Sequence, residues 1–355
     1  MGAQKAPRGS AYTVRVTSQI ASPRPPKRRR FVAPILVTLL LLIAATAGAA
    51  YLLAYNWFSD VQKVGVADPS LSRPAETVAQ DGQKAPINIL LLGSDSREAT
   101  TDLSDMTGFR SDAIMLAQVS SDRKHLTFMS IMRDNWVPIE GHGEAKINAA
   151  FSYGGVPLAV NTVEHFIDAR IDHVMIVDFE SFKGLTDAVG GVTVHNDVAF
   201  TSSHSDAYFE EGEIRLESGD RALDFVRERY SFADGDYQRV RNQQAFMKGL
   251  VQSILARDTL SSPSKLLDTA NALKPYLIVD EEFTLNTAIG LGLQTASLRG
   301  EGITFFTSPT LGTGTSDDGQ SIVIPDMDEM ANVRAAIRAG TLQEYAAAAG
   351  QAEGS

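Results

Sequence analysis

Apolar and polar residues follow one another in a pattern that predicts a layered α/β domain from Ile87 onward. Short continuous apolar runs at 87–92, 113–119 and 126–131 are typical of strands buried on both faces of a sheet. Further strands are predicted at 173–179, 192–195, 303–306 and 322–324, and helices at 156–168, 180–188, 236–256, 282–297 and 326–338. Because strands and helices interleave along the chain, the expected fold class is α/β.

One segment is apolar without the periodicity of a globular element. Residues 31–54 form an apolar run of 24 residues, and no residue from Phe31 to Ser59 is charged. At about 1.5 Å per residue, the run is long enough to cross a hydrocarbon core of about 30 Å. Four basic residues, 27–30, directly precede it. We therefore expect a single transmembrane helix with a cytoplasmic N-terminus and an extracytoplasmic domain. A signal peptide cleaved near residues 47–49 is the alternative, but the apolar run continues past that site.

The charge distribution differs on the two sides of this segment. The chain has 355 residues and a formal charge of −11, but residues 1–30 hold eight Lys or Arg and no acid. The rest of the chain holds 24 basic and 43 acidic residues, a net charge of −19. The first 30 residues are expected to be a disordered cytoplasmic tail, whose charge sets topology and attracts anionic lipid rather than nucleic acid.

Composition narrows the class of protein further. A hydrophobic content of 44% with 21% charged residues excludes wholesale disorder. The absence of Cys excludes disulfides and Cys-ligated metals. Residues 55–85 lack periodicity and are expected to be a stem that lifts the domain off the membrane. The domain is expected over 86–340, followed by a flexible tail over 341–355.

Charged residues collect at one edge of the predicted sheet. The short connection 120–124 favours an antiparallel meander for the first three strands. The first strand then ends at Asp95, and the second starts just after Arg110 and Asp112. The third strand returns to the same edge and ends at Arg133. These residues could instead form ordinary surface ion pairs. However, acidic and basic side chains from three successive strands lie at one edge, which favours a functional site.

The helix that starts at Asp236 continues its apolar stripe with polar residues. Asp236, Arg239 and Gln243 project onto the stripe at its N-terminal end. A buried arginine needs an anion, and a helix N-terminus favours phosphate. A structural Asp–Arg cap pair is the alternative. Just upstream, Arg227 and Arg229 would point the same way if that segment is extended, which suits the oxygens of a phosphate or pyrophosphate.

Six motifs follow one another in register between residues 86 and 258. They are NILLLGSDSR (88–97), FRSDAIML (109–116), SIMRDNWVPI (130–139), KINAAFSYGG (146–155), DHVMIVDFESFKGLTDAVGGVTV (172–194) and ALDFVRERYSFADGDYQRVRNQQ (222–244). Together they resemble the motifs of the LytR–CpsA–Psr family of bacterial cell-envelope phosphotransferases. The resemblance implies a mixed central sheet with helices on both faces, preceded by one transmembrane helix.

The resemblance also implies an activity and a set of site residues. The family transfers a glycopolymer from a polyprenyl-pyrophosphate carrier to peptidoglycan, with Mg²⁺ or Mn²⁺ at the pyrophosphate. It implies an apolar pocket for the polyprenyl tail between the sheet and helices such as 156–168 and 180–188. Carried over by motif, the metal ligands are Asp95 and Asp112, the catalytic positions are Arg133, Arg229 and Asp236, and the phosphate-binding positions are Arg110, Lys146, Arg227, Arg239 and Gln243.

Two positions depart from the family pattern. Met132 stands where the family often has Pro, and Asn242 stands where it often has Arg. The second departure would remove one phosphate contact or leave it to Arg241.

Two other functions have less support in the sequence than the transferase. A non-catalytic polyprenyl-phosphate binder is disfavoured by the intact Asp95, Asp112 and Arg133. A membrane-bound transcription regulator is disfavoured because the basic tail has no helix-turn-helix pattern. The six His show no HExxH spacing and no GxSxG occurs, so zinc-protease and serine-hydrolase chemistry lack support.

Overall fold

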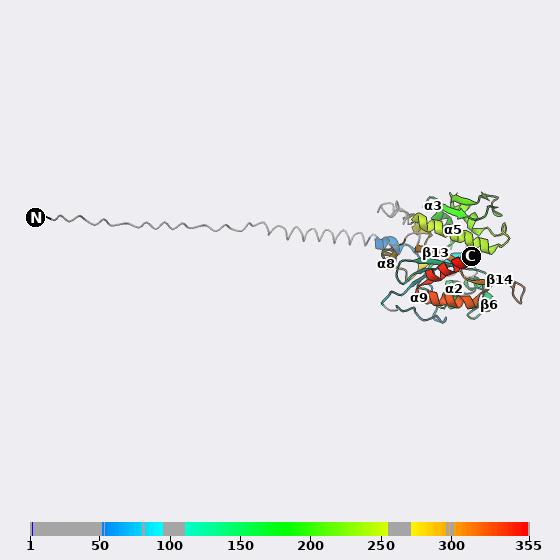
Figure 1. The fold of residues 1–355 in the computed structure, drawn as a ribbon, viewed down its shortest axis with the longest axis horizontal. Coiled ribbons are helices and arrows are strands. Elements are labelled where there is room, and N and C mark those ends of the chain that lie inside the picture. The colour runs from blue at the N-terminus through cyan, green and yellow to red at the C-terminus, as the bar shows by residue number, and fades with distance from the viewer. Residues whose placement is uncertain are drawn as a thin grey trace. The chain divides into compact units, whose positions relative to one another are not determined.

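The computed structural model describes residues 2, 52, 54–79, 82–94, 111–254, 271–295, 298 and 302–353. Met1–Ala54 and Tyr55–Ser355 form two separate units, and the second contains all the elements below (Figure 1). Most of the predicted membrane span at 31–54 lies outside the described residues. Within the described part of the chain, every helix is too short or too polar to cross a bilayer.

A seven-stranded mixed sheet forms the middle layer of the second unit. Its order is β1 (Gln62–Val64), β12 (Ile278–Asp280), β7 (His173–Val177), β2 (Ile87–Ser94), β3 (Ser111–Val119), β4 (Leu126–Ile131) and β13 (Ile303–Thr307). The strands β2, β3 and β4 form the antiparallel meander that the sequence predicts. By contrast, β7 runs parallel to β2 and β13 runs parallel to β4.

Helices cover both faces of this sheet, as expected (Figure 1). The helices on one face are α2 (Ala149–Ile167), α9 (Met327–Ala339) and α10 (Leu342–Glu353), and those on the other are α3 (Phe179–Ala188), α4 (Gly219–Arg227), α5 (Asp236–Ile254) and α8 (Leu285–Thr295). Side chains of β2 point alternately to the two faces of the sheet, so that one strand packs against both helix layers. Leu90 and Leu92 pack in the core with α2 and α9, whereas Ile89 and Leu91 pack with α5 and α8.

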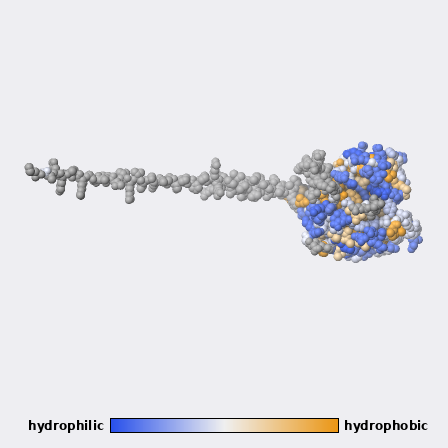
Figure 2. Space-filling view, viewed as in Figure 1, coloured by the Kyte–Doolittle hydropathy of each residue, from blue (hydrophilic) through white to orange (hydrophobic). Residues whose placement is uncertain are grey.

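Short two-stranded sheets and one 3₁₀ turn complete the described part of the domain. They are β5 (Trp136–Ile139) with β6 (Gly143–Lys146), β8 (Val192–Asn196) with β11 (Gly212–Leu216), β9 (Phe200–Thr201) with β10 (Tyr208–Phe209), β14 (Thr310–Thr315) with β15 (Ser321–Pro325), and η3 (Lys274–Tyr276). Hydrophilic residues cover most of the visible surface, and hydrophobic residues form small separate patches (Figure 2).

Three segments differ from the sequence predictions. Residues 62–64 of the expected stem form β1 at the edge of the sheet, where they pair with β12. Residues 219–227 are helical, so Arg227 ends a helix instead of lying in an extended segment. The expected flexible tail over 341–355 instead contains α10, which is held down because Leu342 is fully buried and Tyr345 packs on Phe306.

Gly249 allows α5 to pack closely against β8. A Cβ at this position would collide with the carbonyl oxygen of Thr193. We predict that Gly249→Ala lowers the free energy of unfolding by about 1–3 kcal/mol, since overpacking outweighs the better helix propensity of Ala. Gly292 in α8 is the matched control, because a Cβ there meets no atom within 4 Å. Gly292→Ala should stabilise the protein by about 0.5–1 kcal/mol. Urea denaturation measures both values, and equal effects of the two substitutions would contradict the packing argument.

Candidate active site

Charged side chains meet at the predicted edge of the sheet, where β2 and β4 end and β3 begins. Ser94 at the end of β2 pairs in register with Ser111 at the start of β3. Asp112 on β3 forms an ion pair with Arg133, which follows β4 by two residues. The meander therefore brings these two predicted site residues into contact. Asp95 and Arg110, which the sequence predicts at the same edge, lie outside the described residues.

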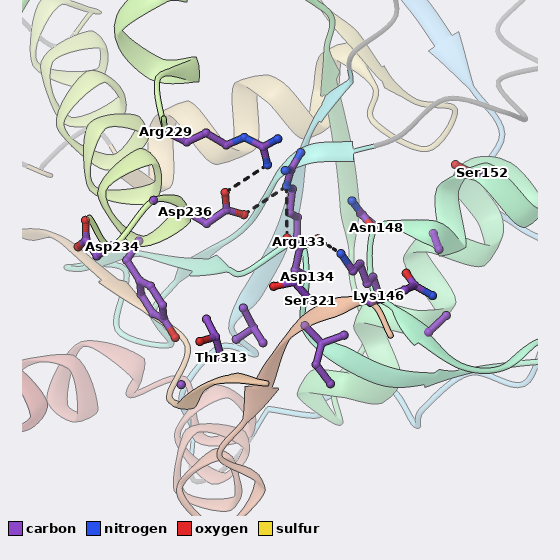
Figure 3. Close-up of a pocket in the computed structure, with 18 of the residues that line it drawn as sticks. Arg133, Asp134, Lys146, Asn148, Ser152, Arg229, Asp234, Asp236, Thr313 and Ser321 are labelled. Carbon is purple, nitrogen blue, oxygen red and sulfur yellow. Dashed lines mark hydrogen bonds and ion pairs between the residues drawn. The ribbon is translucent and has the colours of Figure 1, made fainter. Parts of the chain in front are cut away.

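Asp236, the first residue of α5, lies among three arginines, of which Figure 3 shows Arg133 and Arg229. Its Oδ2 accepts hydrogen bonds from Nη2 of Arg239 at 2.9 Å and from Nε of Arg133 at 3.4 Å. Its Oδ1 lies 3.7 Å from Nη1 of Arg229. Burial would raise the pKa of Asp236, but Arg239, Arg133 and Arg229 outweigh burial and hold the pKa below its ordinary value. The carboxylate is therefore charged at neutral pH and is a weak proton acceptor.

Two of these arginines are largely buried, where a charged guanidinium group loses most of its hydration. The side chains of Arg133 and Arg239 are 15% and 6% exposed. Burial would lower the pKa of Arg133, but Asp112, Asp236 and Asp134 outweigh it and raise the pKa. The pKa of Arg239 is lowered, first by burial and then by the positive charge of Arg133. Nε of Arg239 is buried and has no hydrogen-bond partner among the described residues. An unmatched buried donor beside other cations favours an added anion.

Four arginines line one cavity of about 140 Å³, which we call the arginine pocket. Its lining residues are Asp112, Arg133, His204, Arg227, Arg229, Tyr230, Arg239 and Gln243. The guanidinium of Arg227 lies over the ring of Phe179 at 4.5 Å, and that of Arg229 over the ring of Tyr230 at 4.6 Å. These contacts orient the planar groups.

The arginine pocket carries an excess of positive charge. Among the residues that the structure describes, four guanidinium groups face two carboxylates, Asp112 and Asp236. A third carboxylate nearby, Asp134, pairs with Lys146 at 3.3 Å, so these groups hold two more cations than anions. A doubly charged anion such as a pyrophosphate diester matches this excess, and guanidinium groups bind its oxygens in pairs.

Two further cavities adjoin the arginine pocket. An apolar pocket of about 150 Å³ lies between β2 and β3 and the helices α3, α4 and α5. It shares Asp112, Arg227 and Gln243 with the arginine pocket. A polar cleft of about 940 Å³ shares Arg133 and Arg229 with it. The three cavities therefore form one series from apolar through cationic to polar.

The position of the apolar pocket corrects one expectation. Helix 180–188 was expected to line it, and α3 does so through Phe179, Phe182 and Leu185. Helix 156–168 was also expected there, but α2 packs on the opposite face of the sheet.

The polar cleft holds residues suited to a sugar. Lys146 at the end of β6 pairs with Asp134 at 3.3 Å, so this predicted phosphate ligand lies in the cleft rather than in the arginine pocket (Figure 3). The ring of Tyr153, a residue 47% exposed, stacks on His142 with centroids 4.5 Å apart. The lining also includes side chains with hydroxyl or amide groups, namely Asn148, Ser152, Thr313, Gln320 and Ser321. These groups can hydrogen-bond to and stack against a saccharide.

The two departures from the family pattern have structural explanations. Asn242 is buried and ties α5 to α4, because its Nδ2 donates to the carbonyl of Phe225 at 3.1 Å. Arg241 donates from Nε to Gln238 at 2.8 Å and pairs with Asp234. Neither residue lines the arginine pocket, so Arg241 does not replace a missing phosphate ligand there. Met132 is 1% exposed and packs in the core.

Glu228 is a site residue that the sequence prediction missed. It is fully buried, and its Oε1 accepts the backbone N–H groups of Arg229 at 2.9 Å, Tyr230 at 2.7 Å and Ser231 at 3.1 Å. Its Oε2 accepts the N–H of Ser203 at 2.5 Å. Burial would raise the pKa of Glu228, but these hydrogen bonds outweigh it and lower the pKa. The carboxylate thus fixes the segment that carries Arg229 beside the segment that carries His204. In the sequence, the position of Glu228 between Arg227 and Arg229 was the feature that could have indicated this role.

We predict that Glu228→Gln displaces Arg229 and destabilises the protein by about 1–3 kcal/mol at neutral pH, since an amide cannot accept all four N–H bonds. The folded-state pKa of Glu228 is lowered, so its stabilising effect is full above the unfolded pKa and is lost as the pH falls through the folded value. The difference between variant and wild type should therefore shrink in acid. Urea denaturation at several pH values measures it, with the exposed Glu217→Gln as control. A difference that stays constant down to acid pH would refute the role of the charged carboxylate.

Comparisons with known proteins agree with this fold. A sequence model of the LytR_cpsA_psr family matches residues 56–339. The polyisoprenyl-teichoic acid–peptidoglycan teichoic acid transferase TagU of Enterococcus faecalis is 29% identical over 309 residues, which cover 87% of this chain and 96% of that protein. The protein of the same name from Bacillus mycoides is 33% identical over 250 residues, covering 68% and 78%. The crystal structure of B. subtilis TagV covers 73% of this chain and 98% of that one, with a TM-score of 0.61 and 25% identity. The chain therefore belongs to the LytR_cpsA_psr family, as its motifs indicate.

Proposed function

We propose that this protein transfers a glycopolymer from a polyprenyl-pyrophosphate carrier to peptidoglycan. One observation carries the proposal: the arginine pocket lies between an apolar pocket and a polar cleft. A polyprenyl-pyrophosphate-linked saccharide has the same three chemical parts in the same order. The names of the TagU relatives, which specify teichoic acid and peptidoglycan, support the same class of donor and acceptor.

In the proposed reaction, a sugar hydroxyl oxygen of peptidoglycan attacks the phosphorus that bears the glycopolymer. A new P–O bond forms, and the bond to the bridging oxygen breaks, so that polyprenyl phosphate leaves with the electron pair. Arg133, Arg229 and Arg239 neutralise the charge that develops on the leaving phosphate. Asp236 orients these three groups, and its lowered pKa makes it a poor base. The hydroxyl proton passes to another carboxylate of the cleft or to water.

A divalent cation is part of this proposal. Asp112 would hold Mg²⁺ or Mn²⁺ together with Asp95, which lies outside the described residues. No cluster of three or more His, Asp or Glu suited to a metal occurs among the residues that the structure describes. A single described carboxylate still fits, because Mg²⁺ is commonly bound by one or two carboxylates and the substrate phosphates. Asp112 is 28% exposed and lines both the arginine pocket and the apolar pocket. When bound, the cation would neutralise charge on the pyrophosphate.

We further propose that residues 31–54 anchor the protein in the cell membrane as a single span, with the tail cytoplasmic and the domain extracytoplasmic. The uncharged run and the preceding basic residues support this topology.

Substitution of the arginines tests the function directly. We expect Arg133→Ala and Arg229→Ala each to lower the transfer rate by about 10²–10³-fold, the typical effect of removing one donor that stabilises transition-state charge. Transfer from a lipid-linked donor to peptidoglycan fragments measures the rate. Arg241→Ala is the matched control, because Arg241 lies on the same helix as Arg239 but outside the arginine pocket. Near-normal transfer by both pocket variants would refute the assignment. Donor binding without transfer by the wild type would identify a non-catalytic binder.

Metal removal tests the cation separately. Chelation should abolish transfer, and Mg²⁺ or Mn²⁺ should restore it. Asp112→Asn should raise the metal concentration needed for half-maximal transfer and weaken Mn²⁺ binding in the presence of donor, whereas the exposed Asp317→Asn should leave both unchanged. Full activity after chelation would show that the arginines act without a cation.

A further inference from the structure

The helix α8 presents apolar residues to the outside of the domain. No residue from Phe283 to Leu298 is charged. None of the residues of α8 is fully buried, and Ile289 and Leu293 are 43% and 74% exposed. These two residues are four positions apart, so they lie on the same side of the helix. An uncharged surface helix with large exposed apolar side chains is typical of a docking surface.

The other side of α8 packs where the chain enters the domain. Ala288 and Leu291 belong to the apolar cluster that contains Trp57 and Phe58. Trp57 follows the end of the apolar run at Ala54 by three residues, which span at most about 11 Å. If residues 31–54 cross the membrane, this length of chain keeps the neighbourhood of α8 at the membrane surface.

Basic and aromatic groups surround the C-terminal half of α8 and its packing partner. Gln294 accepts hydrogen bonds from Arg123 at 2.9 Å and from Lys84 at 3.1 Å. Lys274 lies 5.5 Å from the ring centroid of Trp57 and pairs with Asp60 at 2.7 Å. Lys, Arg and Trp near an apolar surface are characteristic of a membrane interface with anionic lipid. The acidic residues Glu281 and Glu282 precede the other end of the helix.

Apolar residues also connect α8 with the apolar pocket. Leu291 packs in a cluster with Met115 and Met247, and both of these residues line that pocket. The arginine pocket lies at the opposite end of the strands, since Arg123 in the β3–β4 turn contacts α8 and Arg133 follows β4. The eight residues of β2 span about 26 Å. A lipid tail must cover that distance between the membrane and the arginine pocket.

We infer that the face of α8 formed by Ile289 and Leu293 rests on the outer surface of the lipid bilayer, and that the tail of the donor passes along this helix into the apolar pocket. This inference rests on the proposed membrane anchor and transferase function. It commits to a bilayer as the occupant of the surface.

The absence of Cys in the chain permits a direct test. Leu293→Cys in the full-length protein is labelled with an environment-sensitive fluorophore and placed in phosphatidylcholine–phosphatidylglycerol nanodiscs. Leu311→Cys is the control, because Leu311 is 70% exposed on β14, which lies at the other end of the domain from α8 (Figure 1). We expect nitroxides on the lipid acyl chains to quench the label at 293 several-fold more than that at 311, and aqueous iodide to show the reverse order. If iodide quenches the labels at 293 and 311 equally, the label at 293 is in water and the inference is overturned. Shielding of the label at 293 from both quenchers would also overturn it, since a second copy or another segment would then cover α8.

A second measurement separates this inference from the proposed function. Leu293→Asp should lower transfer from a long-chain donor embedded in nanodiscs several-fold through a higher KM, and should leave transfer from a short-chain, water-soluble donor at the wild-type rate. Equal loss with both donors, or no loss with either, would contradict a role of α8 in lipid entry. If the wild type transfers from neither donor, the proposed function fails, and the quenching comparison alone decides where α8 lies.

Discussion

The site depends on one carboxylate that holds together three guanidinium groups. Asp236 lies between 2.9 and 3.7 Å from nitrogens of Arg239, Arg133 and Arg229. Burial removes the water that would screen these like charges. Without the carboxylate of Asp236, the three arginines would therefore repel one another strongly. Among the described residues, Asp236 and Asp112 offset two of the four positive charges around the pocket. The remaining charge destabilises the free protein locally, and an anion with two charges would remove that cost.

The fold places this charge at a junction between different environments. The meander of β2, β3 and β4 brings Asp112 and Arg133 to one edge of the sheet, and the N-terminus of α5 brings Asp236 and Arg239 to the same place. On one side the sheet and helices enclose an apolar pocket, and on the other the hairpins β5–β6 and β14–β15 form a polar cleft. A substrate with a lipid tail, a pyrophosphate and a saccharide would bind in only one direction. Phosphoryl transfer depends mostly on such positioning and on charge stabilisation.

Sequence patterns predict most of the described fold because buried strands and amphipathic helices leave local signals. The apolar runs of β2, β3 and β4 and the stripe of α5 belong to this class. They place Asp112 and Arg133 at one edge of the sheet, whereas only the family resemblance joins Asp236 to that edge. The helix α4 also leaves local signals, because the side chain of Ser218 accepts the N–H of Arg221 and Ala222, Phe225 and Val226 form the buried side of the helix. The prediction of an extended segment at Arg227 gave these signals too little weight. Glu228 was missed because its role depends on backbone N–H groups of a loop, which no residue pattern specifies. The position of Lys146 in the cleft depends on the hairpin β5–β6, whose strands are only four residues each.

A crystal structure with a bound polyprenyl-pyrophosphate-linked disaccharide would locate the two phosphorus atoms. We expect both atoms in the arginine pocket within hydrogen-bonding reach of Arg133, Arg229 and Arg239, with the lipid tail between the sheet and α3, α4 and α5. Phosphates bound beside Lys146 in the polar cleft, with none in the arginine pocket, would contradict this expectation.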